Sequence, residues 1–352
     1  MALSAVDVIG PAFEHMKQQL FSPFRFGQWV RLAIVGLLAG ELGMGGCNFP
    51  GGGGGSRSGG GEPQLPEVGF PGGSAMLFAG VIGLLILLGI VLMLVFLYIS
   101  SRMRFVLFDS VLEQECRVRE FWRQRSVQGF RYFLFQLLFA LGSTVVVLAI
   151  VGIPALLAFA VGWFNSPGDH LLPLILGGIV VALVFFAFVI TAMIFQVLVK
   201  DFVVPQMALE NASVGQAWGR AWEMIKGEKG AYAGYLGMKL VLAIAAGVGL
   251  GILTLIIVII VLLPIGGVGA IAVLGGGAAG LSWNPVTIAA AIVLGALVLV
   301  CLLFLAALIS VPATVFFPAY AIHFFAERYP ALHAALHPPP PVYDVSGPSP
   351  QP

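Results

Sequence analysis

The sequence predicts an all-α integral membrane protein in which six transmembrane helices form three parallel repeats, each with an amphipathic helix on the inner surface. Hydrophobic residues make up 59% of the chain, and Asp, Glu, Lys and Arg together only 9%. A soluble domain has about 25% charged residues, so this composition indicates that lipid surrounds much of the chain. Long apolar segments and a one-sided distribution of basic residues support the same fold class.

Six segments are apolar enough to cross a bilayer, which takes about 20 residues. They lie near residues 28–46, 75–100, 132–163, 171–199, 232–263 and 286–319. The first is the shortest and contains Glu41. No charged residue occurs between Lys239 and Glu327, and none lies in the middle of any segment. Because proton pumps, voltage sensors and most ion-coupled transporters keep such residues, the sequence argues against those classes.

The basic residues predict the orientation. With six spans, every Lys and Arg except Arg57 falls on the side that carries both termini. Because Lys and Arg accumulate on the cytoplasmic side of membrane proteins, we expect a multi-pass protein of the bacterial inner membrane. Its N-terminus and C-terminus are then both cytoplasmic.

Three weakly structured segments are expected beside the spans. "MGGC" at residues 44–47 loosely resembles the cleavage site of a lipoprotein, but the long preceding segment favours an external Gly-rich loop over 47–73 rather than lipidation of Cys47. The uncharged stretch 264–285 is either a re-entrant segment or an external cap. A polytopic membrane domain is expected over 1–330, followed by a disordered, Pro-rich cytoplasmic tail over 331–352.

An internal repeat is predicted by an alignment of residues 105–123 with 202–220. Phe105 then pairs with Phe202, Glu113 with Glu210, and "AFEHMK" at 12–17 gives a fainter third copy of "AWEMIK" at 221–226. Each unit would be an inner-surface helix followed by two spans, with repeats at about 1–100, 101–199 and 200–328. Units with two spans each share one orientation, which makes the repeats parallel.

The surface helices combine aromatic and basic residues, which is typical of helices that lie in the headgroup layer. The candidates for contact with anionic lipid headgroups are Arg117, Arg119, Trp122, Arg123, Trp218, Arg220, Trp222 and Lys226. The same pattern suits helices that only connect the spans and pack beneath them, and the sequence does not separate these two interpretations.

Few residues suggest a catalytic or metal-binding site. Asp109 and Asp201 could face each other at an inner mouth, although ion pairs with Arg102, Arg104 or Lys200 are the favoured interpretation. His323 and Glu327 share the i,i+4 spacing of a metal site, as do His333 and His337, but Pro330 separates the two pairs and a solvated helix end is favoured. We therefore expect no catalytic residue, no metal, no cofactor and no nucleic-acid partner.

"RFVLFD" at 104–109 and "KDFVVPQM" at 200–207, each followed by a surface helix, carry a family resemblance. The chain resembles uncharacterised bacterial six-helix proteins similar to the membrane domain of glycerophosphoryl diester phosphodiesterases. The resemblance implies an inner-membrane protein without an assigned reaction. The catalytic barrel of those phosphodiesterases has no counterpart here, so their activity does not carry over.

The function expected first is a lipid-facing scaffold or accessory protein whose partner is the bilayer itself. A transporter or channel for a small neutral or amphipathic solute through the repeat interface is the alternative. A membrane-embedded enzyme comes third, because it would need His323, Glu327, Asp109 and Asp201 to converge.

Overall fold

A computed structural model describes residues 4–41, 74–164, 168, 170–278 and 285–337, and these residues form helices without any strand. The helices are α1 (Ile9–Phe21), α2 (Phe26–Ala39), α3 (Ser74–Leu112), α4 (Val118–Gln124), α5 (Ser126–Ala160), α6 (Leu171–Leu198), the π-helix η1 (Val199–Val203), α7 (Val204–Glu210), α8 (Val214–Gly227), α9 (Lys229–Ala278), α10 (Pro285–Ala326) and α11 (Pro330–Leu336).

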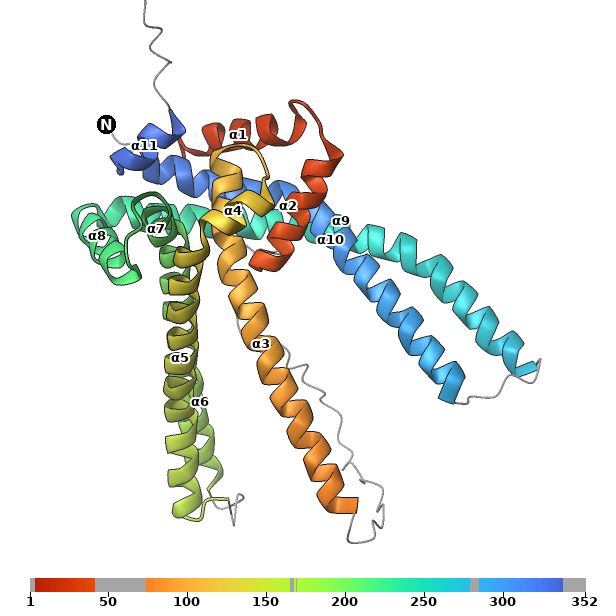
Figure 1. Cartoon of the computed structure of the whole chain (residues 1–352). Coiled ribbons are helices and arrows are strands. Elements are labelled where there is room, and N and C mark those ends of the chain that lie inside the picture. The colour runs from red at the N-terminus through yellow and green to blue at the C-terminus, as the bar shows by residue number, and fades with distance from the viewer. Residues whose placement is uncertain (1–3, 42–73, 165–167, 169, 279–284, 338–352) are drawn as a thin grey trace, which may run out of the picture.

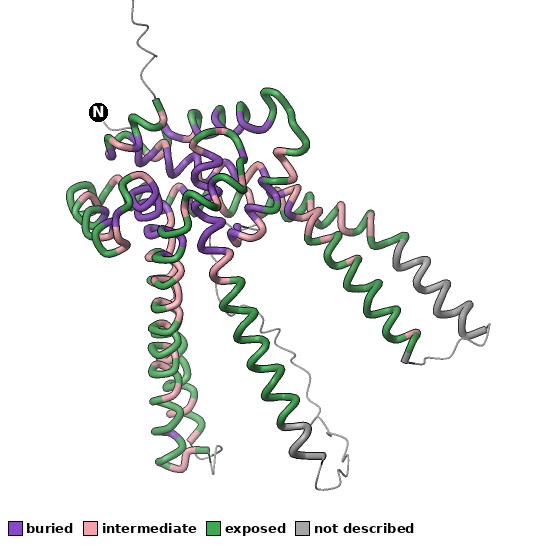
Figure 2. Tube along the Cα trace, viewed as in Figure 1, coloured by how far each residue is buried: buried purple, intermediate pink, exposed green. Residues whose placement is uncertain are grey.

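The described chain consists of a folded head and three diverging arms (Figure 1). The arms are α3 alone, the pair α5 and α6, and the pair α9 and α10. The head contains the short helices together with the ends of the long helices that reach it. Buried residues lie almost entirely in the head, whereas the arms are exposed along most of their length (Figure 2).

Five helices are long and apolar enough to cross a membrane. They cover Gly80–Leu112, Ser126–Ala160, Leu171–Glu210, Lys229–Pro264 and Val286–Ala326. In the most apolar part of each helix, at most 6% of the residues are buried within the chain. Exposed Leu, Ile, Val and Phe side chains on this scale are stable only in lipid, so the chain is a multi-pass membrane protein.

The first predicted span differs from the other five. Its described part is α2, whose 14 residues measure about 21 Å, less than the roughly 30 Å of a bilayer core. Gly40 ends α2 with a left-handed φ of 77°, and Glu41 is buried in the head. The described residues therefore show five long spans rather than six, because the left-handed glycine ends α2 at the head; residues 42–46 lie outside them.

Other predicted boundaries also shift. Helix α9 continues through Pro264 to Ala278, so most of the stretch 264–285 is a continuation of a span; residues 279–284 lie outside the described part. Helix α11 starts with Pro330 at its first position, where proline suits a helix, and extends the folded chain past the expected boundary at residue 330. The predicted loop 47–73, with Cys47, and residues 338–352 lie outside the described residues.

An aromatic core holds the ends of the arms together in the head. Phe202 of η1 lies 5.2 Å from Phe325 of α10 and 5.3 Å from Tyr235 of α9, measured between ring centroids. Tyr235 in turn lies 4.5 Å from Phe324. These rings are fully buried, so the packing energy of the fold is concentrated where the spans meet.

Candidate functional site

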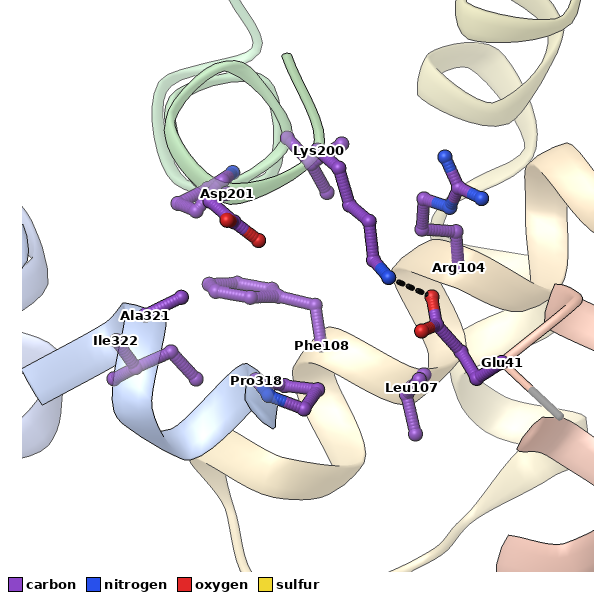
Figure 3. A pocket seen from close by; sticks show the side chains of 11 residues that line it. Glu41, Arg104, Leu107, Phe108, Lys200, Asp201, Pro318, Ala321 and Ile322 are labelled. Carbon is purple, nitrogen blue, oxygen red and sulfur yellow. Dashed lines mark ion pairs between the residues drawn. The ribbon is translucent and has the colours of Figure 1, made fainter. Parts of the chain in front are cut away.

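A small cavity lies in the head where three long helices converge. It has room for roughly two water molecules. Three sets of residues with the same i, i+3, i+4 spacing line it, one set from each converging helix, and Glu41 completes the wall (Figure 3). The sets are Arg104, Leu107 and Phe108 of α3; Asp201, Val204 and Pro205 of η1 and α7, with Lys200 beside them; and Pro318, Ala321 and Ile322 of α10.

Helical geometry explains this lining. Residues at i, i+3 and i+4 share one face of a helix, so each converging helix turns one face toward the cavity. Arg104 directly precedes Phe105, and Asp201 directly precedes Phe202. The first two sets therefore occupy the same register as the alignment of 105–123 with 202–220.

The cavity wall carries charged side chains that are largely withdrawn from water. Lys200 forms an ion pair with Glu41 across the cavity, and the two side chains are only 9% and 4% exposed (Figure 3). Buried charges of this kind need a partner, because the bare ion would lose its hydration without compensation. The pair joins Glu41, two residues after the end of α2, to η1, which follows α6 in the head.

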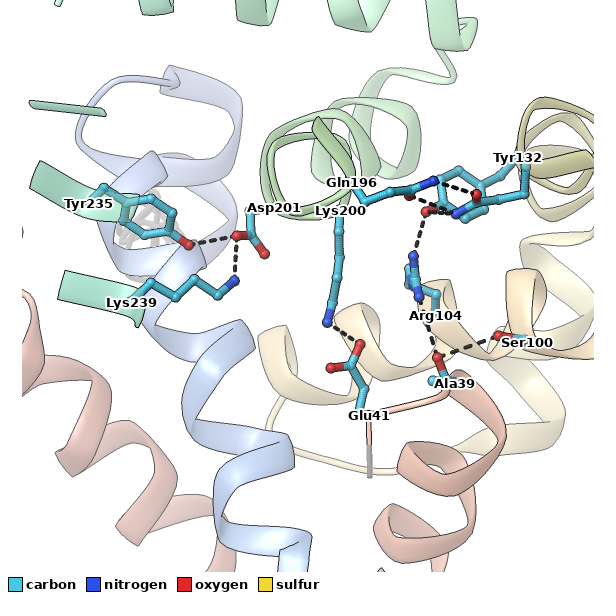
Figure 4. Close-up of polar contacts among 11 residues, drawn as sticks. Ala39, Glu41, Ser100, Arg104, Tyr132, Gln196, Lys200, Asp201, Tyr235 and Lys239 are labelled. Atoms are coloured by element: carbon cyan, nitrogen blue, oxygen red, sulfur yellow. Dashed lines mark hydrogen bonds and ion pairs between the residues drawn. The ribbon is translucent and has the colours of Figure 1, made fainter. Parts of the chain in front are cut away.

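A second buried ion pair lies beside the first. Lys239 of α9 binds Asp201, and the Tyr235 hydroxyl donates a hydrogen bond of 2.9 Å to the same carboxylate (Figure 4). Both charged side chains are at most 6% exposed. Asp201 thereby fixes the head end of α9 against η1.

Arg104 forms the third part of the cluster. It donates a hydrogen bond of 2.6 Å to the Tyr132 hydroxyl and a longer one of 3.4 Å to the Ala39 carbonyl (Figure 4). Gln136 donates to Tyr132 as well and exchanges hydrogen bonds with Gln196 of α6. The Arg104 Nε atom is buried and has no hydrogen-bond partner among the described residues.

The predicted acidic pair does not meet. Asp109 accepts hydrogen bonds of 2.7 and 2.9 Å from Arg125, whereas Asp201 binds Tyr235 and Lys239. The favoured interpretation as ion pairs therefore agrees with the contacts, but the partners are Arg125 and Lys239 rather than Arg102, Arg104 or Lys200. Arg125 lies between α4 and α5, and Lys239 lies in α9. Both partners therefore come from elements farther along the chain than the basic residues next to each aspartate in sequence.

His15 and His323 join α1 to α10, so His323 is not at the solvated helix end that the sequence favours, whereas the His333 and His337 rings lie 4.9 Å apart on α11 and at its end. His323 Nε2 lies 3.3 Å from His15 Nδ1, and His15 Nε2 lies 2.8 Å from the Val111 carbonyl oxygen. Burial lowers the pKa of His15, which favours the neutral ring. Within the described part of the chain, no group of three or more His, Cys, Asp or Glu could hold a metal ion.

The headgroup candidates lie on the outside of the head. Arg117, Arg119, Arg123, Arg220 and Lys226 are exposed. Some of these charges have acidic neighbours, because Arg117 pairs with Glu115 and Arg220 with Glu210.

The tryptophans among these candidates divide into covered and open side chains. Trp122 is covered by the guanidinium of Arg102 at 4.1 Å, and Trp218 packs on Phe195 of α6 at 4.7 Å. Trp222 is 45% exposed, with the Lys226 ammonium 5.5 Å from its ring. Trp222 and Lys226 are therefore the open aromatic and basic pair of α8.

Sequence reasoning missed the buried cluster as a unit. The sequence indicates Asp201 as a candidate acid, but it does not group Glu41, Arg104, Lys200 and Lys239 into one site with it. The available signal was the placement of Lys200 and Asp201 directly after an apolar span, together with Glu41 inside a predicted one. Charges at such boundaries are expensive to bury and point to a polar junction.

Comparisons with known proteins place the chain in a family without assigning an activity. No curated protein and no solved structure matches it. No similarity to glycerophosphoryl diester phosphodiesterases is found, so the resemblance noted for residues 104–109 and 200–207 gains no support. A family described as "Family of unknown function (DUF7544)" matches residues 3–335, and the chain belongs to that family.

Proposed function

We propose that the protein is a lipid-facing scaffold or accessory protein of the bacterial inner membrane, with its head at the cytoplasmic surface and no enzymatic activity. The observation that carries this proposal is the exposure of the arms, because at most 6% of the residues in their most apolar segments are buried. Arms of this kind offer their side chains to lipid or to partner helices rather than to one another. The head holds the three arms at fixed positions around the buried charge cluster.

The proposed orientation rests on where the basic residues lie. Arg117, Arg123, Arg220 and Lys226 all belong to the head, which also holds α1 and α11 near the two chain ends (Figure 1). Because the cytoplasmic side is the basic side, the head is cytoplasmic in this proposal. Ala39 lies beside Ser100 in the head, whereas Ser74 begins α3 at the far end of that arm.

The threefold repeat is part of the proposal. It is supported by the three sets of cavity residues, which share one spacing on α3, η1 with α7, and α10. The surface helices give further support: Ala12 and Ala221, aligned in "AFEHMK" and "AWEMIK", are both buried. Their neighbours Phe13 and Trp222 are 52% and 45% exposed.

The contacts favour the scaffold over the two other expected functions. A transporter would need a polar path between the spans, but the arms diverge and their exposed faces are apolar. The cavity described above, whose wall is mainly apolar apart from its charged side chains, lies at the head ends of the arms. An enzyme would need its candidate acids and histidines together, yet Asp109, Asp201 and His323 each bind a different partner.

The test uses the full-length protein in bilayers that contain spin-labelled phosphatidylglycerol or phosphatidylcholine. If α8 lies among the headgroups, the Lys226→Gln variant should reduce the preference for phosphatidylglycerol by a factor of up to about five, because one basic residue near the surface contributes about 1 kcal/mol. Glu223→Gln, an acid-to-neutral change on the same helix, should raise that preference. Equal lipid preference in both variants and the unmodified protein would contradict headgroup binding by α8.

A further inference from the structure

Among the residues that the structure describes, the buried cluster in the head carries more positive than negative charge. Its cations are Arg104, Lys200 and Lys239, and its carboxylates are Glu41 and Asp201. Each carboxylate has its own lysine as an ion-pair partner. The described contacts of Arg104 are a hydroxyl, a carbonyl oxygen and no carboxylate. An uncompensated charge in a buried site is costly, so the cluster as it stands favours one additional anion.

The cavity lies close to the level at which the arms enter lipid. On α3, Phe96 is 52% exposed, and Arg104 follows about two helical turns, or roughly 12 Å, farther toward the head. On α6, Ile194 is 43% exposed and Lys200 follows about 9 Å farther on. If the apolar arms fill the hydrocarbon layer, Arg104 and Lys200 lie at the depth of lipid phosphates.

We propose that this cavity binds the phosphate group of an anionic phospholipid, whose acyl chains lie between the arms. A phosphodiester with an uncharged headgroup carries a single negative charge, which balances the single excess positive charge of the cluster. Zwitterionic lipids carry no net charge and leave that excess in place. The free space accommodates roughly two oxygen-sized atoms, which fits the non-bridging oxygens of a phosphodiester but not a complete headgroup.

The donors in the cavity suit this ligand. Arg104 lines the cavity and is already held in place by Tyr132. A guanidinium presents planar, paired donors that match phosphate oxygens. Lys200 supplies a second positive charge from the facing helix, where Glu41 holds it. Leu107, Phe108 and Ile322 give the remaining wall an apolar surface that suits the glycerol and first acyl carbons.

This site depends on the membrane location of the arms and not on the surface helices of the proposed function. The Lys226→Gln variant should therefore leave it intact. Failure of headgroup binding by α8 and failure of the cavity site are separate outcomes.

The experiment measures the thermal stability of the full-length protein in a neutral detergent, titrated separately with short-chain phosphatidylglycerol, phosphatidylethanolamine, phosphatidylcholine and inorganic phosphate. Phosphatidylglycerol should raise the melting temperature most. Arg104→Gln should weaken its apparent affinity by roughly ten- to hundredfold, because the variant loses a charged hydrogen-bond donor to the phosphate. The matched control is Arg102→Gln, an equally buried arginine of α3 that binds Tyr98 and Trp122 outside the cavity, and it should retain the affinity.

A second variant, expected to increase the apparent affinity for phosphatidylglycerol, distinguishes an effect on binding from a general loss of stability. Glu41→Gln removes a carboxylate from the cluster, so it should lower stability without lipid but increase the apparent affinity for phosphatidylglycerol. Equal affinities in Arg104→Gln and the unmodified protein, or weaker binding in Glu41→Gln, would overturn the proposal. Equal stabilisation by inorganic phosphate or by phosphatidylcholine would overturn the assignment to an anionic lipid.

Discussion

Arg104 and Asp201 make equivalent contacts on two different helices with side chains of opposite charge. Arg104 donates a hydrogen bond to the Tyr132 hydroxyl at 2.6 Å, and Asp201 accepts one from the Tyr235 hydroxyl at 2.9 Å. The buried phenylalanine that follows each residue packs against the same tyrosine: Phe105 lies 5.7 Å from Tyr132, and Phe202 lies 5.3 Å from Tyr235.

The correspondence extends one turn along the next helix. Gln136 follows Tyr132 by one helical turn and donates to its hydroxyl, whereas Lys239 follows Tyr235 by one turn and binds Asp201. A neutral glutamine thus accompanies the arginine, and a lysine accompanies the aspartate. The contact of Arg104 with Tyr132 and the contact of Asp201 with Tyr235 therefore share their packing and differ in charge. As a result, the charge on the cavity wall differs between α3 and η1.

Removing Lys239 should destabilise the head strongly. In Lys239→Met the Asp201 carboxylate stays buried and loses its cation, and breaking one side of a buried pair costs about 3–5 kcal/mol. The unfolding midpoint of the full-length protein in detergent measures this loss. The control Arg220→Gln breaks the exposed pair with Glu210 and should cost about 0–1 kcal/mol.

A second substitution separates charge from packing. Asp201→Asn in the Lys239→Met background removes the stranded carboxylate, so it should restore most of the lost stability. A double variant that is less stable than Lys239→Met alone would show that the charge of Asp201 is not the cause.

The class of the fold follows from sequence because lipid exposure imposes a strong compositional signal. Each of the five long spans overlaps one predicted segment and extends beyond it, mainly at the end that reaches the head. The first predicted segment, 28–46, differs because hydropathy does not show that Gly40 takes a left-handed conformation and ends α2. The cluster around Glu41 and Lys200 was missed for a related reason: its members come from separate helices, and only tertiary packing brings them together.

Gly36 should tolerate no larger side chain. A Cβ atom at this position of α2 would lie 2.6 Å from Thr314 Cγ2 of α10, and the β-branched Thr314 has little rotamer freedom in a helix. Gly36→Val should therefore destabilise the protein by about 1–3 kcal/mol, as overpacking does. Gly251→Val is the matched control, because no atom lies within 4 Å of a Cβ built at Gly251 in α9. Thermal unfolding of both variants in detergent tests the difference, and equal losses would show that the α2–α10 contact is not tight.

Thiol labelling should report the orientation of the head. Cys116 is 4% exposed and burial raises the pKa of its thiol, so it should react slowly with maleimides in the native protein. A cysteine introduced at the exposed position Glu120 in a background without Cys47, Cys116 and Cys301 should react rapidly. In intact cells a membrane-impermeant maleimide should leave position 120 unlabelled, whereas inverted vesicles should expose it. Rapid labelling in intact cells would place the head in the periplasm and contradict the proposed topology.

The imidazole pair between α1 and α10 should make stability depend on pH. His15 Nε2 donates to the Val111 carbonyl, so Nδ1 accepts the proton of His323 Nε2 only while His15 is neutral. Burial lowers the pKa of His15 in the folded state below its usual value of about 6.5. The unfolded chain therefore binds a proton first as pH falls. The stability that depends on neutral His15 is present above about pH 6.5 and is lost as the pH falls below it, by at most about 1.4 kcal/mol per pH unit.

Thermal unfolding of the full-length protein between pH 8 and pH 5 tests this dependence against His15→Gln, whose amide can still donate to Val111 but does not titrate. The unmodified protein should lose more stability over this range than the variant does. The neighbouring charges of α1, Glu14 and Lys17, are both 58% exposed and should contribute little. Parallel pH curves for the two proteins would assign the acid sensitivity to other groups and would leave the His15–His323 contact without a role in it.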